Sequence, residues 1–106
     1  MSARSVDVRL SRAALRDIDD LLLYMQRTWG TRRRVSYLAA FYRTLGRLSR
    51  YPAAGRPRDD LFLGCRDIHV EQHVIYYYQP DDATIVVRRI LHQRQHAGVA
   101  VIDPRS

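Results

Sequence analysis

The sequence predicts an α+β fold made of one strand, an antiparallel two-helix hairpin and a three-stranded antiparallel meander (β-α-α-β-β-β). Three observations support this order. An alternating segment comes first, two long segments with apolar residues at helical spacing follow, and three closely spaced runs of β-branched and aromatic residues come last. A chain of 106 residues suffices for one core, so we expect residues 1–106 to form a single domain, with 95–106 as its tail.

The first strand is expected over residues 5–10. Val6, Val8 and Leu10 alternate there with Asp7 and Arg9, which is the pattern of a strand with one buried face. Such a strand must join an edge of the meander sheet or remain unpaired.

Two helices follow the strand. Ser11 is a good N-cap for the first helix, and Gly30 is expected to end it. The apolar positions of the first helix are Ala14, Ile18, Leu21, Leu22, Met25 and Trp29. Thr31 is expected to cap the second helix, whose apolar positions are Leu38, Phe41, Tyr42, Leu45 and Leu48. Because only a short turn separates the helices, they should pack as an antiparallel hairpin.

The second half of the chain supplies the meander. Pro52, Gly55 and Pro57 mark an exit loop over residues 51–63, in which 55–60 cannot be helix or central strand. Strands are expected at 65–70, 73–79 and 83–92, with turns at 71–72 and at Pro80-Asp81-Asp82. The helix hairpin should cover one face of this sheet, since amphipathic helices and a small sheet need each other to bury their apolar sides.

Charge is the second informative property. The formal net charge is +7, the sequence pI is about 10.3, and all 18 basic side chains are arginines. Such a chain should bind an acidic partner, which could be a nucleic acid, an anionic surface or an acidic polypeptide, although compositional bias gives the same excess. The absence of lysine excludes lysine-dependent chemistry.

The sequence also indicates a compartment. Cys65 is the only cysteine, which excludes an intrachain disulfide and fits a reducing cytoplasm. The first residues lack the apolar core of a signal peptide, and the longest apolar runs, 21–25 and 74–78, are too short to cross a bilayer. We therefore expect a cytoplasmic protein without membrane contact.

Candidate chemical groups are few. His69 and His73 could approach each other across a hairpin, but no third ligand is evident, so neither a metal nor a cofactor is expected. No nucleophile–base triad, phosphate-binding loop or dinucleotide fingerprint is present. Three carboxylate pairs are predicted to be solvated, namely Asp19-Asp20, Asp59-Asp60 and Asp81-Asp82.

The last strand is the most unusual segment. Arg88 and Arg89 interrupt its β-branched run, which ends in His92-Gln93-Arg94 and suggests that one face of the sheet is used for binding. In the neighbouring strand, Tyr77 should face one side of the sheet and Tyr76 and Tyr78 the other. These rings could stack nucleobases or cover the core equally well.

A set of ordered landmarks runs through most of the chain. They are Leu10-Ser11, Ala14, Ile18-Asp19-Asp20-Leu21, Tyr24, Trp29-Gly30, Tyr37, Pro52, Gly55-Arg56-Pro57, Gly64, Arg66, His73, Tyr77 and Arg89-Ile90-Leu91-His92-Gln93. In this order they resemble the ParE branch of the ParE/RelE toxin superfamily over about residues 8–93. The resemblance implies the fold above and a small cytoplasmic toxin of a type II toxin–antitoxin pair, neutralised by an antitoxin whose C-terminal segment wraps around it.

Members of this superfamily differ in target. ParE members block DNA gyrase, whereas RelE members cleave mRNA on the ribosome and usually carry arginine where Val74 and Ile75 stand here. The resemblance therefore favours a gyrase inhibitor that is not an enzyme. If the chain were instead a ribosome-dependent endonuclease, its catalytic residues would be Arg66, Tyr77, Arg89 and His92. A third alternative is a toxin-fold binding subunit that has lost its target.

The resemblance also assigns two surfaces. The target-binding residues would be Arg66, His73, Arg89, His92, Gln93 and Arg94. A ParD-like antitoxin is expected along the helix hairpin and the exposed sheet edge, at Leu22, Tyr24, Trp29, Arg33, Tyr37 and Phe41. The chain departs from its relatives at Tyr78, at Arg88 and in the tail 95–106, and direct binding of nucleic acid is left open.

Overall fold

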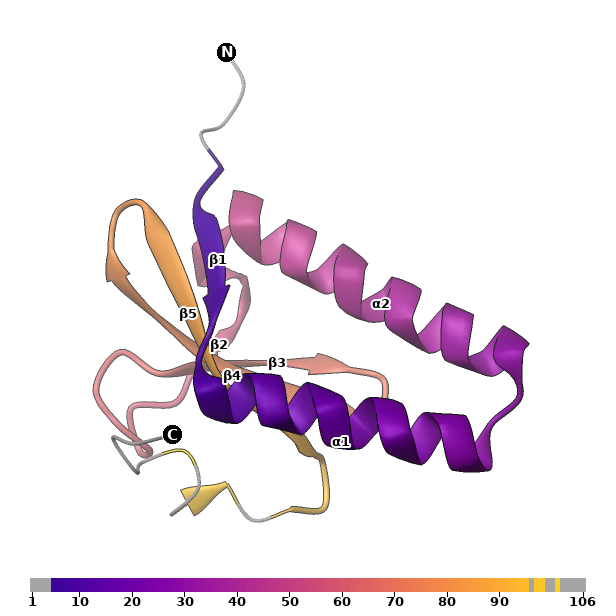
Figure 1. Cartoon of the computed structure of the whole chain (residues 1–106). Helices are drawn as coiled ribbons and strands as arrows, with labels where there is room; N and C mark the ends of the chain where they lie inside the picture. Colours follow the sequence, from indigo (N-terminus) through magenta and orange to yellow (C-terminus); the bar gives the residue numbers. More distant parts are fainter. Residues whose placement is uncertain (1–4, 96, 99–100, 102–106) are drawn as a thin grey trace.

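The chain folds as a five-stranded sheet with two long helices on one face (Figure 1). The computed structural model describes residues 5–95, 97–98 and 101. The elements in chain order are β1 (Asp7–Leu10), α1 (Arg12–Thr28), α2 (Thr31–Arg50), the 3-10 helix η1 (Pro52–Ala54), β2 (Arg56–Pro57), β3 (Arg66–Val70), β4 (His73–Asp81) and β5 (Thr84–His92). The predicted α+β class and the order of its elements are confirmed.

The sheet order is β1-β5-β4-β3-β2, so the N-terminal strand joins an edge. β1 runs parallel to β5, from Asp7 opposite Thr84 to Leu10 opposite Val87, whereas the remaining neighbours are antiparallel. Beyond Leu10, the first residue after β1 continues the hydrogen bonding to the backbone of β5. The Ser11 amide donates to the Val87 carbonyl at 2.9 Å, and its hydroxyl donates to the Arg88 carbonyl at 2.7 Å.

Ser11 is the N-cap of α1, as predicted, and its hydroxyl accepts a hydrogen bond from the Ala14 amide at 3.0 Å. The prediction that Thr31 caps α2 is wrong, because Thr31 is already the first residue of that helix and Gly30 is its N-cap. The connection consists of Trp29, the C-cap of α1, and Gly30, the N-cap of α2.

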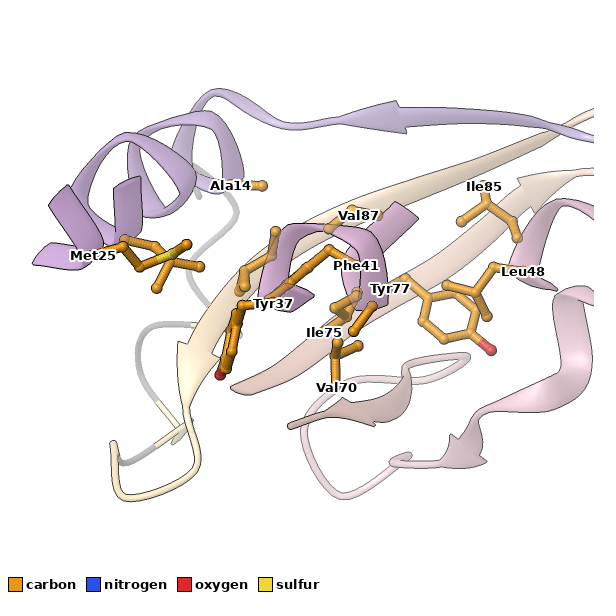
Figure 2. Packing of buried hydrophobic residues seen from close by; sticks show 13 residues of the cluster. Ala14, Met25, Tyr37, Phe41, Leu48, Val70, Ile75, Tyr77, Ile85 and Val87 are labelled. Atoms are coloured by element: carbon orange, nitrogen blue, oxygen red, sulfur yellow. The ribbon is translucent and has the colours of Figure 1, made fainter. Parts of the chain in front are cut away.

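The main core lies between the helices and the sheet, where thirteen buried residues form one cluster (Figure 2). Met25 of α1 and Phe41 and Leu48 of α2 meet Ile75 and Val87 of the central strands there. Two residues assigned to the apolar faces lie outside this core, since Leu22 is 39% exposed and Tyr42 is 74% exposed. Both flank the buried stripe of their helix, so the predicted stripes were wider than the face that this sheet covers.

A second, smaller core covers the opposite face of the sheet and was not predicted. Its buried residues are Cys65, Val74, Tyr76, Leu91 and Val101, with Leu61, Phe62 and Ala97 packed against them. Val101, in the segment treated as an atypical tail, is fully buried. The sheet is therefore covered on both sides, and it does not present an open arginine-bearing face.

The meander differs from its prediction in two places. β4 continues through Pro80 to Asp81, which pairs with Thr84, so the turn comprises residues 82–83 and the predicted turn at Pro80-Asp81-Asp82 is wrong. The pairing with β5 slips between Tyr78 and Asp81, and a proline is tolerated in a strand at such an irregularity. The exit loop also adds β2, a two-residue edge strand against β3.

β2 is held to the sheet by charge as well as by pairing. The Asp67 side chain is 1% exposed and accepts hydrogen bonds from Arg56 Nε at 2.9 Å and from Arg58 Nη1 at 2.8 Å. No helix in the described part of the chain combines the length and the apolar character needed to cross a bilayer.

Candidate functional site

A β-bulge determines where the two adjacent arginines of β5 lie. Tyr76 pairs with Arg89 but the next residue, Tyr77, pairs with Val87, so Arg88 is the extra residue in the ladder. The Arg88 guanidinium lies 4.6 Å from the ring centroid of Phe62, on the side of the second core. Arg89 instead reaches α1, and the two cations point to different neighbours.

Arg89 forms an ion pair with Asp17 of α1. Its Nε and Nη2 atoms donate to the two carboxylate oxygens at 2.8 and 2.9 Å, and the Ile90 amide donates to the same carboxylate at 2.9 Å. The side chains are only 21% and 11% exposed, and the hydrogen bond to Asp17 raises the pKa of Arg89 above its ordinary value. The Asp17 carboxylate thus accepts a backbone hydrogen bond from β5 beyond the point where pairing with β1 has ended.

Tyr77 is fully buried in the main core, whereas Tyr76 lies in the second core and Tyr78 packs against Phe62 on that side, so the predicted alternation of the three tyrosines is confirmed. Its hydroxyl donates to the Pro52 carbonyl at 2.8 Å and accepts from the Gly55 amide at 2.8 Å. Burial raises the pKa of this phenol. Arg66, opposite Tyr77 in the ladder, donates to the Gly55 carbonyl at 2.7 Å. Both side chains therefore hold the η1–β2 segment.

The structure does not bring the four candidate nuclease residues together. Arg66 and Tyr77 lie beside each other, whereas His92 pairs with His73 at the other end of β4. Arg89 lies between these groups and is committed to Asp17. A proton-transfer pair built from Tyr77 and His92 is excluded by this separation and by the burial of the phenol.

A cavity lies where the second half of α1 meets the ends of β4 and β5. It has a volume of about 270 Å³ and is lined by Asp17, Asp20, Leu21, Tyr24, Trp29, Gln72, His73, Ile90, His92 and Gln95. Two residues expected at the target surface and two expected at the antitoxin surface share this lining. The resemblance assigns these two pairs to separate surfaces, whereas the structure places them around one cavity.

His73 forms the inner wall of the cavity. Its Nδ1 atom lies 2.6 Å from the Tyr37 hydroxyl, which also accepts a hydrogen bond from the Gln72 amide at 3.1 Å. In the ring tautomer that carries its proton on Nε2, His73 Nδ1 accepts the Tyr37 hydroxyl proton. Burial, and next the neighbouring His92, lower the pKa of His73 to about 4, so the ring is neutral near pH 7. His69 lies on the opposite face of the sheet, so the two histidines do not converge.

The end of β5 forms the rim of the cavity. The Gln93 amide donates to the Gln72 carbonyl at 2.8 Å, and the Arg94 amide donates to His92 Nδ1 at 3.1 Å. The His92 amide in turn donates to the Gln95 side chain at 2.7 Å. This ordered turn leaves the side chains of Gln93 and Arg94 exposed beside the partly buried His92.

Of the helix-hairpin residues assigned to antitoxin binding, some are exposed and others are buried beneath them. Leu22, Tyr24 and Arg33 are exposed, and the Arg33 guanidinium lies 3.9 Å from the centroid of the Trp29 ring. Tyr24 packs edge-on against Trp29, with the ring centroids 6.0 Å apart. Tyr37 and Phe41, the other two residues assigned to antitoxin binding, are 6% and 7% exposed and support this aromatic surface from below.

Asp17 and Gln72 are the residues of this region that sequence reasoning missed. Asp17 lies three residues after Ala14 and four before Leu21, both buried, so it interrupts the apolar stripe of α1. A carboxylate at such a position needs a partner, and this pattern could have identified it. Gln72 acts mainly through its backbone in the turn at 71–72, which was predicted, but the sequence carries no pattern for the contacts of that backbone with Tyr37 and Gln93.

Comparison with known sequences gives one family. The family described as "ParE toxin of type II toxin-antitoxin system, parDE" matches residues 8–97. The chain is 32% identical over 89 residues to Toxin ParE1 of Caulobacter vibrioides, covering 84% of this chain and 91% of the relative. It is 29% identical over 85 residues to Toxin ParE1 of Mycobacterium tuberculosis, covering 80% and 87% of the two chains.

Solved structures share the fold. A chain of the chromosomal ParDE toxin–antitoxin system from P. aeruginosa superposes with a TM-score of 0.68 at 15% identity, covering 85% of this chain and 98% of the other. A chain of the RelBE2 toxin–antitoxin complex from Mycobacterium tuberculosis superposes with a TM-score of 0.59 at 23% identity, covering 83% and 98%.

Proposed function

Since the chain belongs to the ParE toxin family of type II toxin–antitoxin systems, we propose that it inhibits DNA gyrase in the cytoplasm without catalysing a reaction. We further propose that a ParD-like antitoxin holds it inactive.

The observation that carries the non-catalytic role is the state of the candidate catalytic groups. The Tyr77 hydroxyl has its donor and acceptor functions satisfied by Pro52 and Gly55, inside the core. Arg89 is held by Asp17. Strand cleavage by a ribosome-dependent nuclease needs an accessible acid, base and cation at one place, and these residues are fixed in structural contacts instead.

The target-facing surface that we propose is the rim of the cavity, formed by His92, Gln93 and Arg94 with His73 behind it. The exposed side chains of Gln93 and Arg94 are held on a turn whose backbone amides, from residue 92 to residue 95, all donate hydrogen bonds, which gives a partner a preformed surface. The resemblance also assigns Arg66 and Arg89 to the target surface. We propose that these two arginines support the fold, through their contacts with Gly55 and Asp17, and do not contact the target directly.

The antitoxin surface that we propose centres on Trp29. Tyr24 and Arg33 flank this ring, and Leu22 adds an exposed apolar side chain from α1. An amphipathic segment with acidic residues would pack apolar side chains on Leu22 and Tyr24 and pair with Arg33.

A supercoiling reaction with purified gyrase tests the function. The purified chain should abolish supercoiling, and addition of the antitoxin should restore it. A ribosome-bound mRNA incubated in parallel should remain intact. Site-specific mRNA cleavage that is lost in His92→Ala would establish the nuclease alternative, and silence in both reactions would identify a binding subunit without a target.

A further inference from the structure

The positive charge of this protein is concentrated in one helix. α2 contains six arginines and no carboxylate, whereas the whole chain has 18 arginines, 11 carboxylates and a net charge of +7. The remaining 86 residues therefore hold 12 arginines against 11 carboxylates, a net charge of +1. Compositional bias spreads arginines along a chain, so it does not account for this distribution.

Four of these arginines lie on the solvent side of α2. Arg43, Arg47 and Arg50 follow each other at spacings of four and three residues, and Arg32 lies on the same side three turns earlier. All four are exposed. At 1.5 Å per residue, this α2 arginine row spans about 27 Å. Figure 1 shows α2 along one margin of the molecule, with no other element beyond it.

Among the described residues, the α2 arginine row takes no part in the ion pairs of the fold. Elsewhere arginines pair with carboxylates, as in Arg9–Asp7, Arg58–Asp60 and Arg89–Asp17. Within the part of the chain that the structure describes, none of the four arginines of the row lies in an ion pair.

The surface beside the row is hollowed. A shallow depression of about 380 Å³ is lined by Arg43, Gly46, Arg47, Arg50 and Tyr51. A Cβ atom at Gly46 would meet nothing within 4 Å, so packing does not require glycine at this exposed position in the helix. Glycine there weakens the helix relative to alanine, and the missing side chain leaves this part of the depression open to the close approach of a ligand.

We propose that the α2 arginine row binds the phosphate backbone of double-stranded DNA without reading its sequence. Guanidinium groups bind phosphate oxygens through paired hydrogen bonds, and a straight row of them matches the regular phosphates of a duplex. Binding of single strands relies on aromatic rings among the cations. Tyr51 adds one exposed ring where the row ends, but the positions between Arg43 and Arg50 on this face are Gly46 and Arg47, so the row offers no succession of rings on which consecutive bases could stack. The surface is distinct from the Trp29 region and from the rim of the cavity.

Fluorescence anisotropy of a labelled 20-base-pair duplex of arbitrary sequence, titrated with the full chain between 50 and 200 mM KCl, tests this proposal. The variant Arg43→Gln/Arg47→Gln/Arg50→Gln should bind at least about tenfold more weakly at low salt. The slope of log affinity against log salt should shrink by about 2.7, which is three phosphate contacts at about 0.9 each. The control Arg12→Gln/Arg16→Gln/Arg27→Gln removes the same charge from exposed positions of α1 and should bind nearly as the unmodified chain.

Gly46→Glu is a variant in which a loss of DNA binding would not result from unfolding. Glutamate is a better helix former than glycine and has open space here, so the fold should gain stability while the carboxylate repels phosphates. Its DNA affinity should fall at least about tenfold at low salt.

Three results would overturn the proposal. Equal losses in the α1 and α2 triple variants would assign binding to net charge alone. Tighter binding of the single strand would exclude the duplex as the ligand. Unchanged DNA binding with loss of antitoxin binding in the α2 variant would make the row a protein interface. Because the probe is DNA alone, failure of gyrase inhibition leaves this test intact.

Discussion

The Tyr77 hydroxyl joins two backbone groups of the η1–β2 segment to the central strand. Tyr77→Phe would leave the Pro52 carbonyl and the Gly55 amide without this partner inside the core. We expect a loss of about 1 to 3 kcal/mol in the free energy of unfolding, measured in urea. Tyr78→Phe, which keeps its edge-on ring contact with Phe62, should change stability by less than about 0.5 kcal/mol.

Tyr77→Phe also separates a structural from a catalytic role. If the phenol were an acid or base, its removal would eliminate toxin activity per folded molecule at temperatures where the variant stays folded. We expect that activity to be retained there, because the hydroxyl is directed at backbone atoms of the same chain.

His73 should make stability depend on pH. Its pKa is about 4 in the folded chain against about 6.5 when unfolded, so between these values the unfolded chain binds more protons. The contribution of neutral His73 to the free energy of unfolding is therefore fully present above pH 6.5 and is lost as the pH falls toward 4. Allowing for the partial exposure of the ring, we expect a loss on the order of 2 kcal/mol from this group.

The comparison for His73 is His73→Asn, whose side-chain oxygen can still accept from Tyr37 but does not titrate in this range. Unfolding free energies measured from pH 4 to 7 should fall less steeply for the variant than for the unmodified chain. Parallel curves would contradict the burial of a neutral His73.

At the residue scale, alternation and helical spacing were sufficient to predict the direction of many side chains. The opposite directions of Tyr77 and its two neighbours are an example. The sequence did not predict the pairing of Arg89 with Asp17, because Arg89 and Asp17 are 72 residues apart and the bulge at Arg88 redirects the strand. An arginine expected at a binding surface is exposed there only where no internal partner competes for it, as at Arg94.

At the scale of elements, Asp17 joins α1 to β5. Asp17→Ala would leave Arg89 without its carboxylate and the Ile90 amide without its acceptor. We expect a loss of about 2 to 4 kcal/mol in the free energy of unfolding, since both charges are largely buried. Asp19→Ala, at an exposed position of the same helix, is the control and should stay within about 0.5 kcal/mol of the parent.

A double-mutant cycle decides whether the Asp17–Arg89 contact is responsible. The losses caused by Asp17→Ala and Arg89→Ala should not add in the double variant, because each removes the same interaction. Additive losses would contradict the ion pair as the source of the effect.

Two glycines should respond in opposite directions to alanine. Gly46→Ala should raise the free energy of unfolding by about 0.5 to 1 kcal/mol, because its Cβ meets nothing and alanine favours the helix. Gly55→Ala should lower it by about 1 to 3 kcal/mol, because its Cβ would lie 2.6 Å from both the Asp67 carbonyl oxygen and the Tyr77 hydroxyl. Thermal unfolding of both variants measures the signs, and a gain in stability for Gly55→Ala would contradict the packing around Tyr77.

Local patterns identified the elements, but pairing modified their ends. Both helices and the three meander strands lie close to their predicted positions, because each has a long periodic pattern. The extension of β4 through Pro80 and the small strand β2 depend on partners in β5 and β3. Such partners are distant in sequence, so the turn signature of Pro80-Asp81-Asp82 was misleading on its own.

At the scale of the whole molecule, both faces of the sheet are covered. One face of the sheet packs on the helices and the other on the second core that includes Val101, so binding has to use edges, helix surfaces and the end of β5. The sequence predicted a basic binding protein but placed the cationic surface on the sheet. The burial of both faces could not be predicted, because the segment 95–106, which supplies Val101 to the second core, shows no strand or helix periodicity.

The most direct test of the proposed function is a titration of gyrase with the purified chain in a supercoiling assay. A non-catalytic inhibitor should reduce activity in proportion to its ratio to gyrase, reach completion near stoichiometric binding, and show no further loss on longer incubation. Unaffected supercoiling at a large molar excess of the chain, or complete loss that develops with time at a small fraction of one chain per gyrase, would contradict the account.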